Sequence, residues 1–301
     1  MELKNNGKIN FIIDLFLDLD THISGGLIAL HKLAYLLAEE GHNVYIFCKP
    51  AYPHKNITVI HSERTQIQGH RYSVTFEPFS FNYDNTVSIY PEHTTGNKFC
   101  TQNNVRWIMY HTTLEQESGF GENDYIFNCG NFKTNLKKNH GKLRVVNYNL
   151  DKFYIENNSN RKGFCHILGK ETPKNHKDIL NIFNSTDITK YKHQPDLNLL
   201  RQEFNKYEYF LTFDQKTGLS FAAALCGCKT IILKNNNECS PIEYRLENPE
   251  FMFGIAYGME DLEWASKTLP LIKEHLTELD KLDKKTVKNF ITFWENKLNI
   301  K

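Results

Sequence analysis

Hydrophobic and polar positions alternate in the first half of the chain in a way that predicts strands separated by a helix. The apolar run 8–16 predicts a buried strand, the positions 27–38 recur at helical spacing up to Gly41, and residues 43–48 predict a second strand. The helical positions are Leu27, Leu30, Ala34, Leu37 and Ala38. A strand, a glycine-containing loop, a helix and a strand make a βαβ unit with a right-handed crossover. Further β-rich runs cover residues 87–92, 105–111 and 124–129. This half therefore predicts an open parallel sheet.

The same alternation restarts after a polar, Asn-rich segment, residues 151–162, which we interpret as a linker. Strands are predicted at residues 163–169, 207–213 and 229–233, and helices at residues 175–183 and 217–227. We therefore expect an α/β protein with two Rossmann-like domains, residues 1–152 and 153–283. Ligands of such sheets bind at the carboxyl ends of the strands.

The C-terminal segment, residues 284–301, is predicted to form a helix with one apolar face. Five residues share that face: Val287, Phe290, Ile291, Trp294 and Leu298. Such a face must pack against another part of the protein, and we expect the helix to return to the N-terminal domain.

Length and composition exclude several classes of protein. A chain of 301 residues is long enough for two domains of about 150 residues. Lys and Arg number 36 against 35 Asp and Glu, so the charge gives no footprint for nucleic acid. Seven scattered cysteines suggest reduced thiols in a cytosolic protein, and their spacing gives no structural zinc site. We expect no metal.

The N-terminal apolar stretch is too short for a signal peptide or a membrane span, because Asp14 and Asp18 interrupt it. We therefore expect a cytoplasmic protein. Peripheral contact with the inner face of the membrane stays open, since a lipid-linked substrate would need only a surface patch.

A basic segment follows the predicted strand at the start of the second domain. Residues 161–177 contain five Lys or Arg and one Glu, and Lys170 and Lys174 lie on the strand-to-helix turn. Two ammonium groups near a helix N-terminus can stabilise the charge that develops on a departing diphosphate. The alternative is a solvated basic loop without a ligand.

The segment 213–233, FDQKTGLSFAAALCGCKTIIL, places a polar turn directly before a helix of small residues. Asp214, Thr217, Gly218, Leu219 and Ser220 surround the start of that helix, whose unpaired N–H groups attract anions. Ordinary helix capping explains the same residue types. Because adjacent helix N-termini of one sheet converge on one crevice, this turn and the basic segment together favour a phosphate-bearing ligand.

These two segments resemble the two signatures of retaining GT-B glycosyltransferases of the family 4 type. The resemblance implies that Lys170 and Lys174 hold the donor pyrophosphate and that Asp214, at the first of two acidic positions, holds hydroxyls of the donor sugar. The second acidic position is Ala222, which cannot bind the ribose as the family's acid does. Glu243 in SPIEYR is our candidate for that contact.

Three other segments resemble bacterial and viral polysaccharide glycosyltransferases: residues 90–111, 119–127 and 254–265. The resemblance implies that the N-terminal domain binds the acceptor and the C-terminal domain the nucleotide sugar, across a cleft. Gly25 and Gly26 match a glycine pair over the donor phosphates, where backbone N–H groups approach an oxyanion closely, and they equally suit a tight turn. His111 matches a histidine that contacts the donor sugar, although a structural role explains it too.

Three further polar residues are weaker candidates for the same cleft. His22 lies beside the glycine pair. Glu92 and Arg106 lie within the predicted strands 87–92 and 105–111. An ion pair at the edge of the core would explain both residues equally well.

The resemblance leads us to expect a metal-independent, retaining glycosyltransferase without a cofactor. It would transfer sugar from a nucleoside-diphosphate sugar to a glycan or lipid-linked glycan acceptor, in polysaccharide synthesis such as that of lipopolysaccharide or capsule. Two alternatives stay open: a nucleotide-sugar epimerase or hydrolase of the same fold, and a non-catalytic nucleotide-sugar-binding protein, which Ala222 allows. A Rossmann oxidoreductase is disfavoured because no Gly-x-Gly-x-x-Gly follows a strand.

Overall fold

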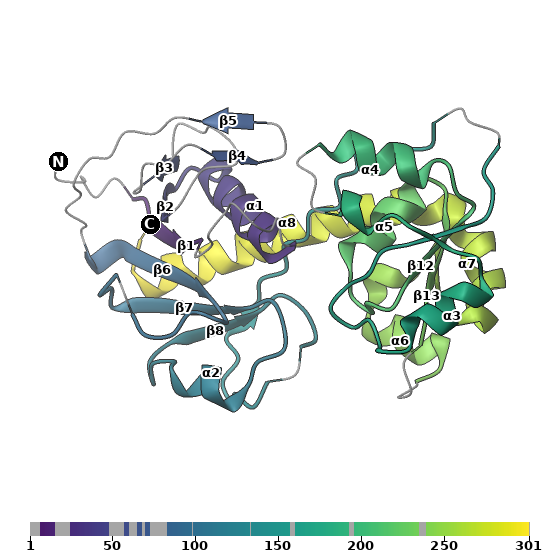
Figure 1. Cartoon of the computed structure of the whole chain (residues 1–301). Helices are drawn as coiled ribbons and strands as arrows, with labels where there is room; N and C mark the ends of the chain where they lie inside the picture. The colour runs from purple at the N-terminus through teal and green to yellow at the C-terminus, as the bar shows by residue number, and fades with distance from the viewer. Residues whose placement is uncertain are drawn as a thin grey trace. The chain divides into compact units, whose positions relative to one another are not determined.

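The computed structural model describes residues 7–15, 25–47, 57–59, 65–67, 70–72, 83–97, 99–132, 134–156, 160–192, 196–234 and 239–300. Contacts divide the chain into two compact units, Met1–Asn147 with Lys281–Lys301 and Tyr148–Asp280. We call them unit 1 and unit 2 (Figure 1). The sequence predicted domain limits at residues 152 and 283. Both lie a few residues after the limits of the units in the structure, which are Asn147 and Asp280.

Unit 1 contains a seven-stranded sheet in the order β3-β2-β1-β6-β7-β8-β9, in which all neighbouring strands are parallel. The strands are β1 (Asn10–Asp14), β2 (Asn43–Phe47), β3 (Ile57–Val59), β6 (Thr86–Pro91), β7 (Asn103–Ile108), β8 (Tyr125–Asn128) and β9 (Gly141–Lys142). A separate antiparallel pair is formed by β4 (Thr65–Ile67) and β5 (His70–Tyr72). The strand order reverses between β1 and β6, so the carboxyl ends of these two strands form a topological switch point.

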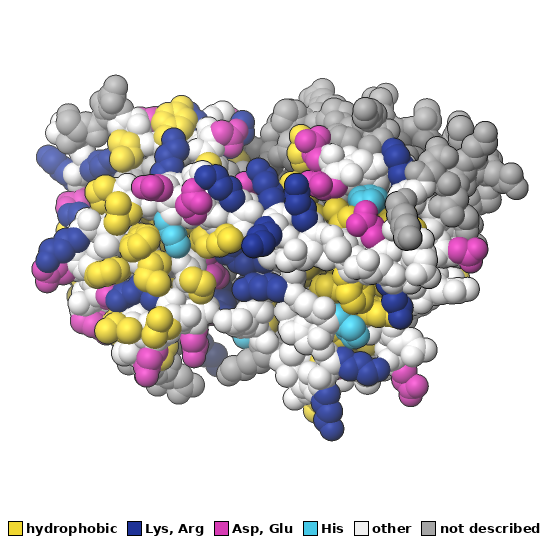
Figure 2. All heavy atoms as spheres, turned by 180° about the vertical axis from the view of Figure 1, so that it is seen from behind, with side chains coloured by type: hydrophobic (Ala, Val, Ile, Leu, Met, Phe, Trp, Pro, Cys, Tyr) yellow, Lys and Arg dark blue, Asp and Glu magenta, His cyan; other side chains and the backbone are white. Residues whose placement is uncertain are grey.

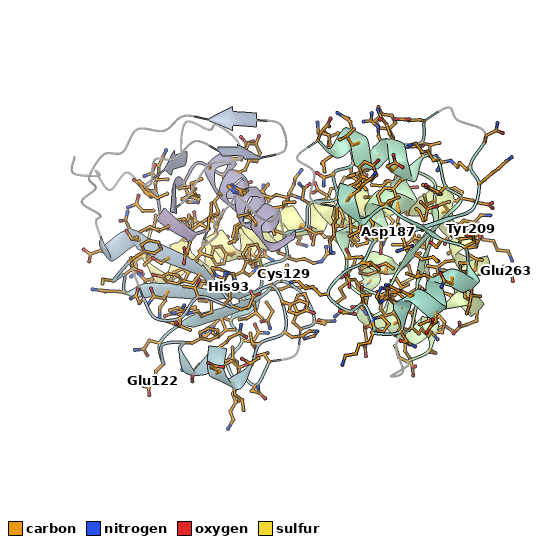
Figure 3. The ribbon with its side chains drawn as sticks, in the orientation of Figure 1. His93, Glu122, Cys129, Asp187, Tyr209 and Glu263 are labelled. Carbon is orange, nitrogen blue, oxygen red and sulfur yellow. The ribbon has the colours of Figure 1, made fainter. Side chains whose placement is uncertain are left out.

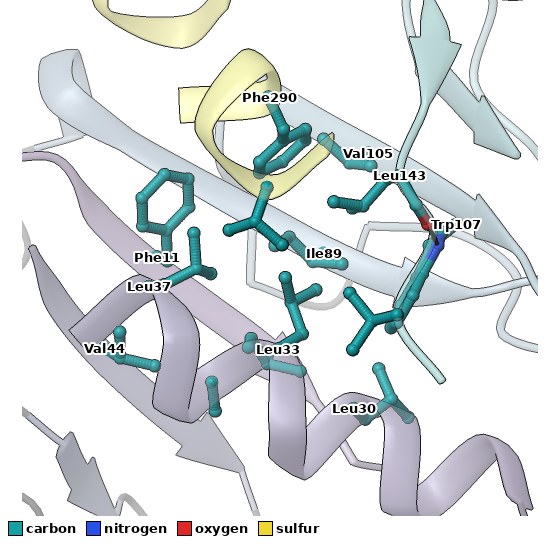
Figure 4. Packing of buried hydrophobic residues seen from close by; sticks show 14 of the residues in the cluster. Phe11, Leu30, Leu33, Leu37, Val44, Ile89, Val105, Trp107, Leu143 and Phe290 are labelled. Carbon is teal, nitrogen blue, oxygen red and sulfur yellow. Dashed lines mark hydrogen bonds between the residues drawn. The ribbon is translucent and has the colours of Figure 1, made fainter. Parts of the chain in front are cut away.

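Within the described residues of unit 1, two α-helices and a short 3-10 turn precede its C-terminal helix. They are α1 (Gly25–Glu39), η1 (Tyr83–Asn85) and α2 (Leu114–Ser118). All five positions that helical spacing placed on the apolar face of α1 are buried, which confirms the amphipathic pattern. Figure 4 shows Leu37 of α1 beside Phe11, Leu33 toward Ile89 and Leu30 on the side of Trp107, all within one apolar core.

The last helix, α8 (Ile272–Lys297), starts in unit 2 and ends in unit 1. Val287, Phe290, Ile291 and Trp294 are buried in the same apolar core as α1 and the strands of unit 1. The apolar face predicted for the C-terminal helix is therefore buried. The second half of α8 is therefore part of the core of unit 1 (Figure 4).

A buried ion pair fixes α8 to the segment that leaves the sheet of unit 1. Asp283 pairs with Arg144 and accepts the N–H of Val146 at 3.1 Å. Thr286 Oγ1 accepts the N–H of Arg144 at 2.9 Å, and Lys32 Nζ donates to the Val146 carbonyl at 2.7 Å. Burial raises the pKa of Asp283 to about 6, against the opposing effect of Arg144. The segment is thus tied to both α1 and α8.

Unit 2 contains a five-stranded parallel sheet in the order β11-β10-β12-β13-β14. The strands are β10 (Phe164–His166), β11 (Thr186–Asp187), β12 (Tyr209–Thr212), β13 (Lys229–Ile232) and β14 (Ile255–Tyr257). The α-helices are α3 (His176–Ile182), α4 (Leu197–Phe204), α5 (Gly218–Leu225), α6 (Pro241–Glu247) and α7 (Leu262–Thr268). Short 3-10 turns are η2 (Thr189–Tyr191), η3 (Pro249–Phe251), η4 (Met259–Asp261) and η5 (Leu269–Leu271). Here the order reverses between β10 and β12.

Small residues on α5 let this helix lie close to its neighbours. Ala222, Ala223 and Ala224 are buried, and the only aromatic residue of the helix, Phe221, packs on Phe251 with ring centroids 4.8 Å apart. Close packing therefore explains part of the small-residue composition of the segment 213–233. The α/β alternation predicted for both halves, with two parallel sheets, is confirmed.

The surface of unit 2 mixes apolar and charged side chains, as Figure 2 shows in its left half. Exposed apolar atoms are normal on folded domains and do not by themselves mark a site. No helix in the described ranges is long and apolar enough to cross a membrane.

Candidate functional site

The candidate site of unit 2 lies at the switch point of its sheet. β10 and β12 are parallel neighbours, so the loops that follow them, residues 167–175 and 213–217, emerge at the same edge. Ligands of open α/β sheets bind in the crevice at such a point. Strand order therefore brings the segment with Lys170 and Lys174 next to the segment with Asp214 and Thr217.

Reciprocal hydrogen bonds join the two loops. The N–H of Glu171 donates to Asp214 Oδ1 at 2.8 Å, and the N–H of Gln215 donates to Glu171 Oε2 at 3.1 Å. Asp214 also lies directly against Gly169, where a Cβ atom would be 1.8 Å from Oδ2. We call the set of Gly169, Glu171, Asp214 and Gln215 the loop clamp. Each carboxylate of the loop clamp accepts a hydrogen bond from a backbone N–H of the opposite loop.

Side chains of α6 and β12 also form hydrogen bonds with the loop 213–217. The hydroxyl of Tyr244, a buried residue of α6, donates to the Gln215 carbonyl, and the N–H of Asp214 donates to Thr212 Oγ1 at 3.1 Å. Tyr244 stacks on Tyr257 with ring centroids 4.1 Å apart. Both backbone polar groups of Gln215 are therefore bound by side chains of other elements.

The clamp places two acids close together. Burial raises the pKa of Glu171, and the negative charge of Asp214 raises it further. The hydrogen bond from the Gln215 N–H and the charge of Lys216 act in the opposite direction. The hydrogen bond from the Gln215 N–H therefore favours the charged form of the half-buried Glu171 carboxylate.

Three lysines approach the end of β10. Lys170 and Lys174 are exposed on the loop after this strand. A third, the half-buried Lys192, donates from Nζ to the Leu168 carbonyl at 3.3 Å, while the Leu168 N–H donates to Thr189 Oγ1 at 2.9 Å. Sequence reasoning missed Lys192 because β11, which precedes it, has only two residues and both are exposed; Figure 3 labels the second, Asp187.

The start of α5 divides the residues predicted there into two groups. Thr217 caps the helix by accepting the Leu219 N–H at 3.3 Å, and Gly218 is exposed at the surface. Ser220 is fully buried, and its Oγ has no hydrogen-bond partner within the described residues. Gly218 and Thr217 can therefore meet a ligand at this helix N-terminus, whereas the Ser220 side chain points into the interior.

Glu243 has a local structural role in α6. Its carboxylate accepts the Ser240 N–H at 2.8 Å and the Ser240 hydroxyl at 2.9 Å, in a capping box at the start of the helix. These two bonds lower the pKa of the exposed Glu243. Ala222, at the family's second acidic position, is buried within α5. The contact with a ribose that we expected from Glu243 would have to compete with capping.

The switch point of unit 1 carries its own acids. Asp14 at the end of β1 is fully buried and accepts from Thr94 Oγ1 at 3.2 Å. Glu92, just after β6, accepts the Met109 N–H at 3.1 Å. His93, the next residue, is exposed and is labelled in Figure 3. These groups line the edge where β1 and β6 end.

Arg106 forms an ion pair at the edge of the core, and its partner is Asp124. Its Nε lies 2.6 Å from Asp124 Oδ2, and its other donors reach the carbonyls of Thr94, at 2.7 Å, and Gly96. The guanidinium also lies over the ring of Tyr90. Arg106 therefore shapes the loop after β6 from within the structure.

His111 belongs to a ring cluster in unit 1. Its imidazole lies 5.0 Å from the ring of Tyr110 and 5.5 Å from that of Phe132, measured between centroids. Glu117 joins the neighbouring segments by accepting from Thr134 Oγ1 and from the Asn135 N–H, each at 2.8 Å. The cluster is a partly exposed aromatic surface after β7 and β8.

Gly25 and Gly26 are the first residues of α1. A Cβ atom on Gly25 would meet nothing within 4 Å, so packing alone does not require a glycine there. The loop before them, including His22, lies outside the described residues. Gly25, Gly26 and His111 are thus placed within unit 1, and the lysines and the loop clamp within unit 2.

In the described ranges no group of three or more His, Cys, Asp or Glu side chains is arranged to hold a metal ion. The described cysteines are not joined in disulfides, and burial raises the pKa of Cys226 to about 12.

No protein-family model matches the chain, and no curated protein matches it either.

Proposed function

We propose that this chain is a retaining, metal-independent glycosyltransferase of GT-B architecture that uses a nucleoside-diphosphate sugar as donor. The observation that carries the proposal is the switch point of unit 2, where a loop with Lys170 and Lys174 is joined to the loop that starts α5. Cations and a helix N-terminus at one crevice suit a diphosphate. The resemblance of these two loops to the family's signatures points to the same ligand.

In the proposed reaction the acceptor hydroxyl oxygen forms a bond to the anomeric carbon while the bond from that carbon to the phosphate oxygen breaks. Lys170 and Lys174 neutralise the charge that develops on the departing diphosphate, and the start of α5 at Gly218 contributes its positive dipole end. The acceptor proton passes to the leaving phosphate oxygen. Attack on the face from which the diphosphate departs retains the anomeric configuration.

We assign the acceptor to unit 1, by resemblance and because its sheet has a switch point of its own. His111, Tyr110 and Phe132 offer an aromatic surface on which an apolar face of a sugar ring can rest. A glycan, free or attached to a lipid, fits such a surface. For Gly25 and Gly26 the proposal keeps the role that the resemblance implies, in which their backbone N–H groups contact the donor phosphates.

A second candidate is a nucleotide-sugar-binding protein without turnover. Ala222 supplies no carboxylate, and Glu243 is already used in a capping box. Both observations leave the ribose without the acid that the family uses. This candidate shares the nucleotide site but not the reaction.

Product analysis distinguishes the candidates. The protein is incubated with UDP-, GDP-, CDP- and dTDP-sugars, with and without a panel of glycan and lipid-linked acceptors, and products are separated by mass spectrometry. A transferase releases nucleoside diphosphate and forms a new glycoside only when an acceptor is present. Release without acceptor indicates a hydrolase, an isomerised donor indicates an epimerase, and binding without any product indicates the non-catalytic protein.

A further inference from the structure

We propose that Asp214 and Glu171 are positioning residues, which lock the two loops of the candidate site into one rigid surface, and that Asp214 does not touch the donor sugar. The nucleotide in this inference rests on the proposed function, whereas the lock itself rests on geometry alone. It replaces the direct sugar contact that the family resemblance implies for Asp214.

The Asp214 carboxylate contacts the backbone of the neighbouring loop. One carboxylate oxygen accepts the Glu171 N–H at 2.8 Å, and the other lies against Gly169 so closely that a Cβ atom there would be 1.8 Å away. One oxygen is thus hydrogen-bonded to the neighbouring loop, and the other packs directly against the backbone of that loop at Gly169. A sugar hydroxyl would have to compete for a carboxylate that already holds the backbone.

The second step concerns Gln215. Its N–H is held by Glu171 at 3.1 Å and its carbonyl by the buried Tyr244. Connecting loops are normally the mobile parts of a fold. A segment whose donor and acceptor are both fixed by other elements is pre-organised, and it delivers Thr217 and the start of α5 in a fixed place.

Charge supplies the third step. A carboxylate that faces a diphosphate repels it, so two acids beside Lys170 and Lys174 weaken the site unless backbone donors neutralise them. Each acid of the loop clamp has such a donor in the opposite loop. Burial raises the pKa of Glu171, and the nearby negative charge of Asp214 raises it further.

Hydrogen–deuterium exchange tests the lock without any ligand. In Glu171→Ala, peptides that cover residues 213–217 should exchange several-fold faster than in the wild type, and Glu171→Gln should restore slow exchange because its amide oxygen can accept the Gln215 N–H. Asp178→Ala, which removes an exposed acid on α3, is the matched control. Unchanged exchange in Glu171→Ala would overturn the inference.

Ligand discrimination tests the role of Asp214. A positioning residue predicts that Asp214→Ala weakens binding of the nucleoside diphosphate and of its sugar conjugate by the same factor, about tenfold, which corresponds to about 1.4 kcal/mol. Direct contact with the sugar predicts a loss for the conjugate alone. That second result contradicts the inference.

Gly169 provides an independent check. Gly169→Ala should weaken nucleotide binding about as much as Asp214→Ala, because the added methyl displaces the carboxylate. In the Asp214→Ala background the same change should have little further effect, since the clash is gone. Equal effects of Gly169→Ala in both backgrounds would contradict the clamp.

The outcomes separate the two proposals. If the wild type binds no nucleotide, the proposed function fails, and the exchange experiment still decides whether the clamp exists. If nucleotides bind and the clamp variants leave both exchange and affinity unchanged, the proposed function survives and this inference fails.

Discussion

At the scale of single residues, buried charges find partners far away in the chain. Asp283 and Arg144 are separated by 139 positions, yet both are buried and joined. Neither was singled out from the sequence, because an isolated charge in an amphipathic pattern reads as solvated. The same limit applies to Lys192, whose role depends on a contact with Leu168.

Removing Asp283 should be costly. Asp283→Ala leaves Arg144 buried without its counter-charge, and we expect the free energy of unfolding of unit 1 to fall by about 3–5 kcal/mol. Urea unfolding measures the loss. Asp151→Ala, which breaks an exposed pair with Lys152, should change stability by less than about 1 kcal/mol. Equal losses in the two variants would contradict this account of the buried pair.

His31 on α1 should make stability depend on pH. Burial lowers its pKa from 6.5 to about 4, so the unfolded chain takes up a proton first as the pH falls. The stabilisation is complete above pH 6.5 and is lost between 6.5 and 4. From pH 7 to pH 5 this histidine should therefore cost the folded state about 2 kcal/mol.

The variant His31→Leu isolates that contribution from other groups, such as Asp283, whose raised pKa acts in the opposite direction. Unfolding free energies of the wild type and the variant are compared at both pH values. The wild type should lose about 2 kcal/mol more than the variant over this range. Parallel pH dependence in the two proteins would show that His31 does not titrate in this way.

Predicted site residues differ in how well the sequence could place them. Lys170, Lys174, Asp214 and Thr217 lie on two loops that strand alternation assigns to the same edge of the sheet, and the order of β10 and β12 in the structure makes these loops neighbours. What Asp214 touches could not be read from the sequence, because Glu171 and Gly169 lie 43 and 45 positions away. Local spacing did not separate capping from ligand binding at Glu243 either, since both use the same residue types.

At the scale of elements, prediction succeeded where apolar residues recur with a clear period. The strong pattern of α1 and of the second half of α8 gave buried faces that the structure confirms. The elements not predicted, such as β11 and α4, are short and have few buried residues. Their stability comes from packing against neighbours, which a local pattern does not show.

Trp294 should report how much α8 contributes to unit 1. Trp294→Ala removes a fully buried ring that packs on Tyr125 at 4.9 Å and on Phe293 at 5.3 Å, measured between centroids, and we expect a loss of about 3–5 kcal/mol. Chemical denaturation followed by circular dichroism measures it. Leu282→Ala, at a position of the same helix that is 55% exposed, should change stability by about 0.5 kcal/mol or less. A small loss in Trp294→Ala would mean that α8 is not part of this core.

At the scale of the whole molecule, each unit has a parallel sheet whose strand order reverses once. Alternation of elements predicted the two α/β halves, and the connection rules limited their topology. Strand order still had to come from the structure, because it depends on contacts between segments far apart in sequence. In the proposed function, ligands bind at these two switch points, as they do in other open α/β sheets.

In the proposed function, a nucleoside diphosphate binds at the switch point of unit 2, next to Lys170 and Lys174. Calorimetric titration of UDP, GDP, CDP and dTDP into the wild type and single-alanine variants tests it most directly, with Lys177→Ala as control because this lysine is exposed on α3. One of the nucleotides should bind the wild type. Loss of either Lys170 or Lys174 should weaken that binding about tenfold, whereas Lys177→Ala changes it less than about twofold. Equal affinity in all four proteins, or no binding to any, would contradict the claim.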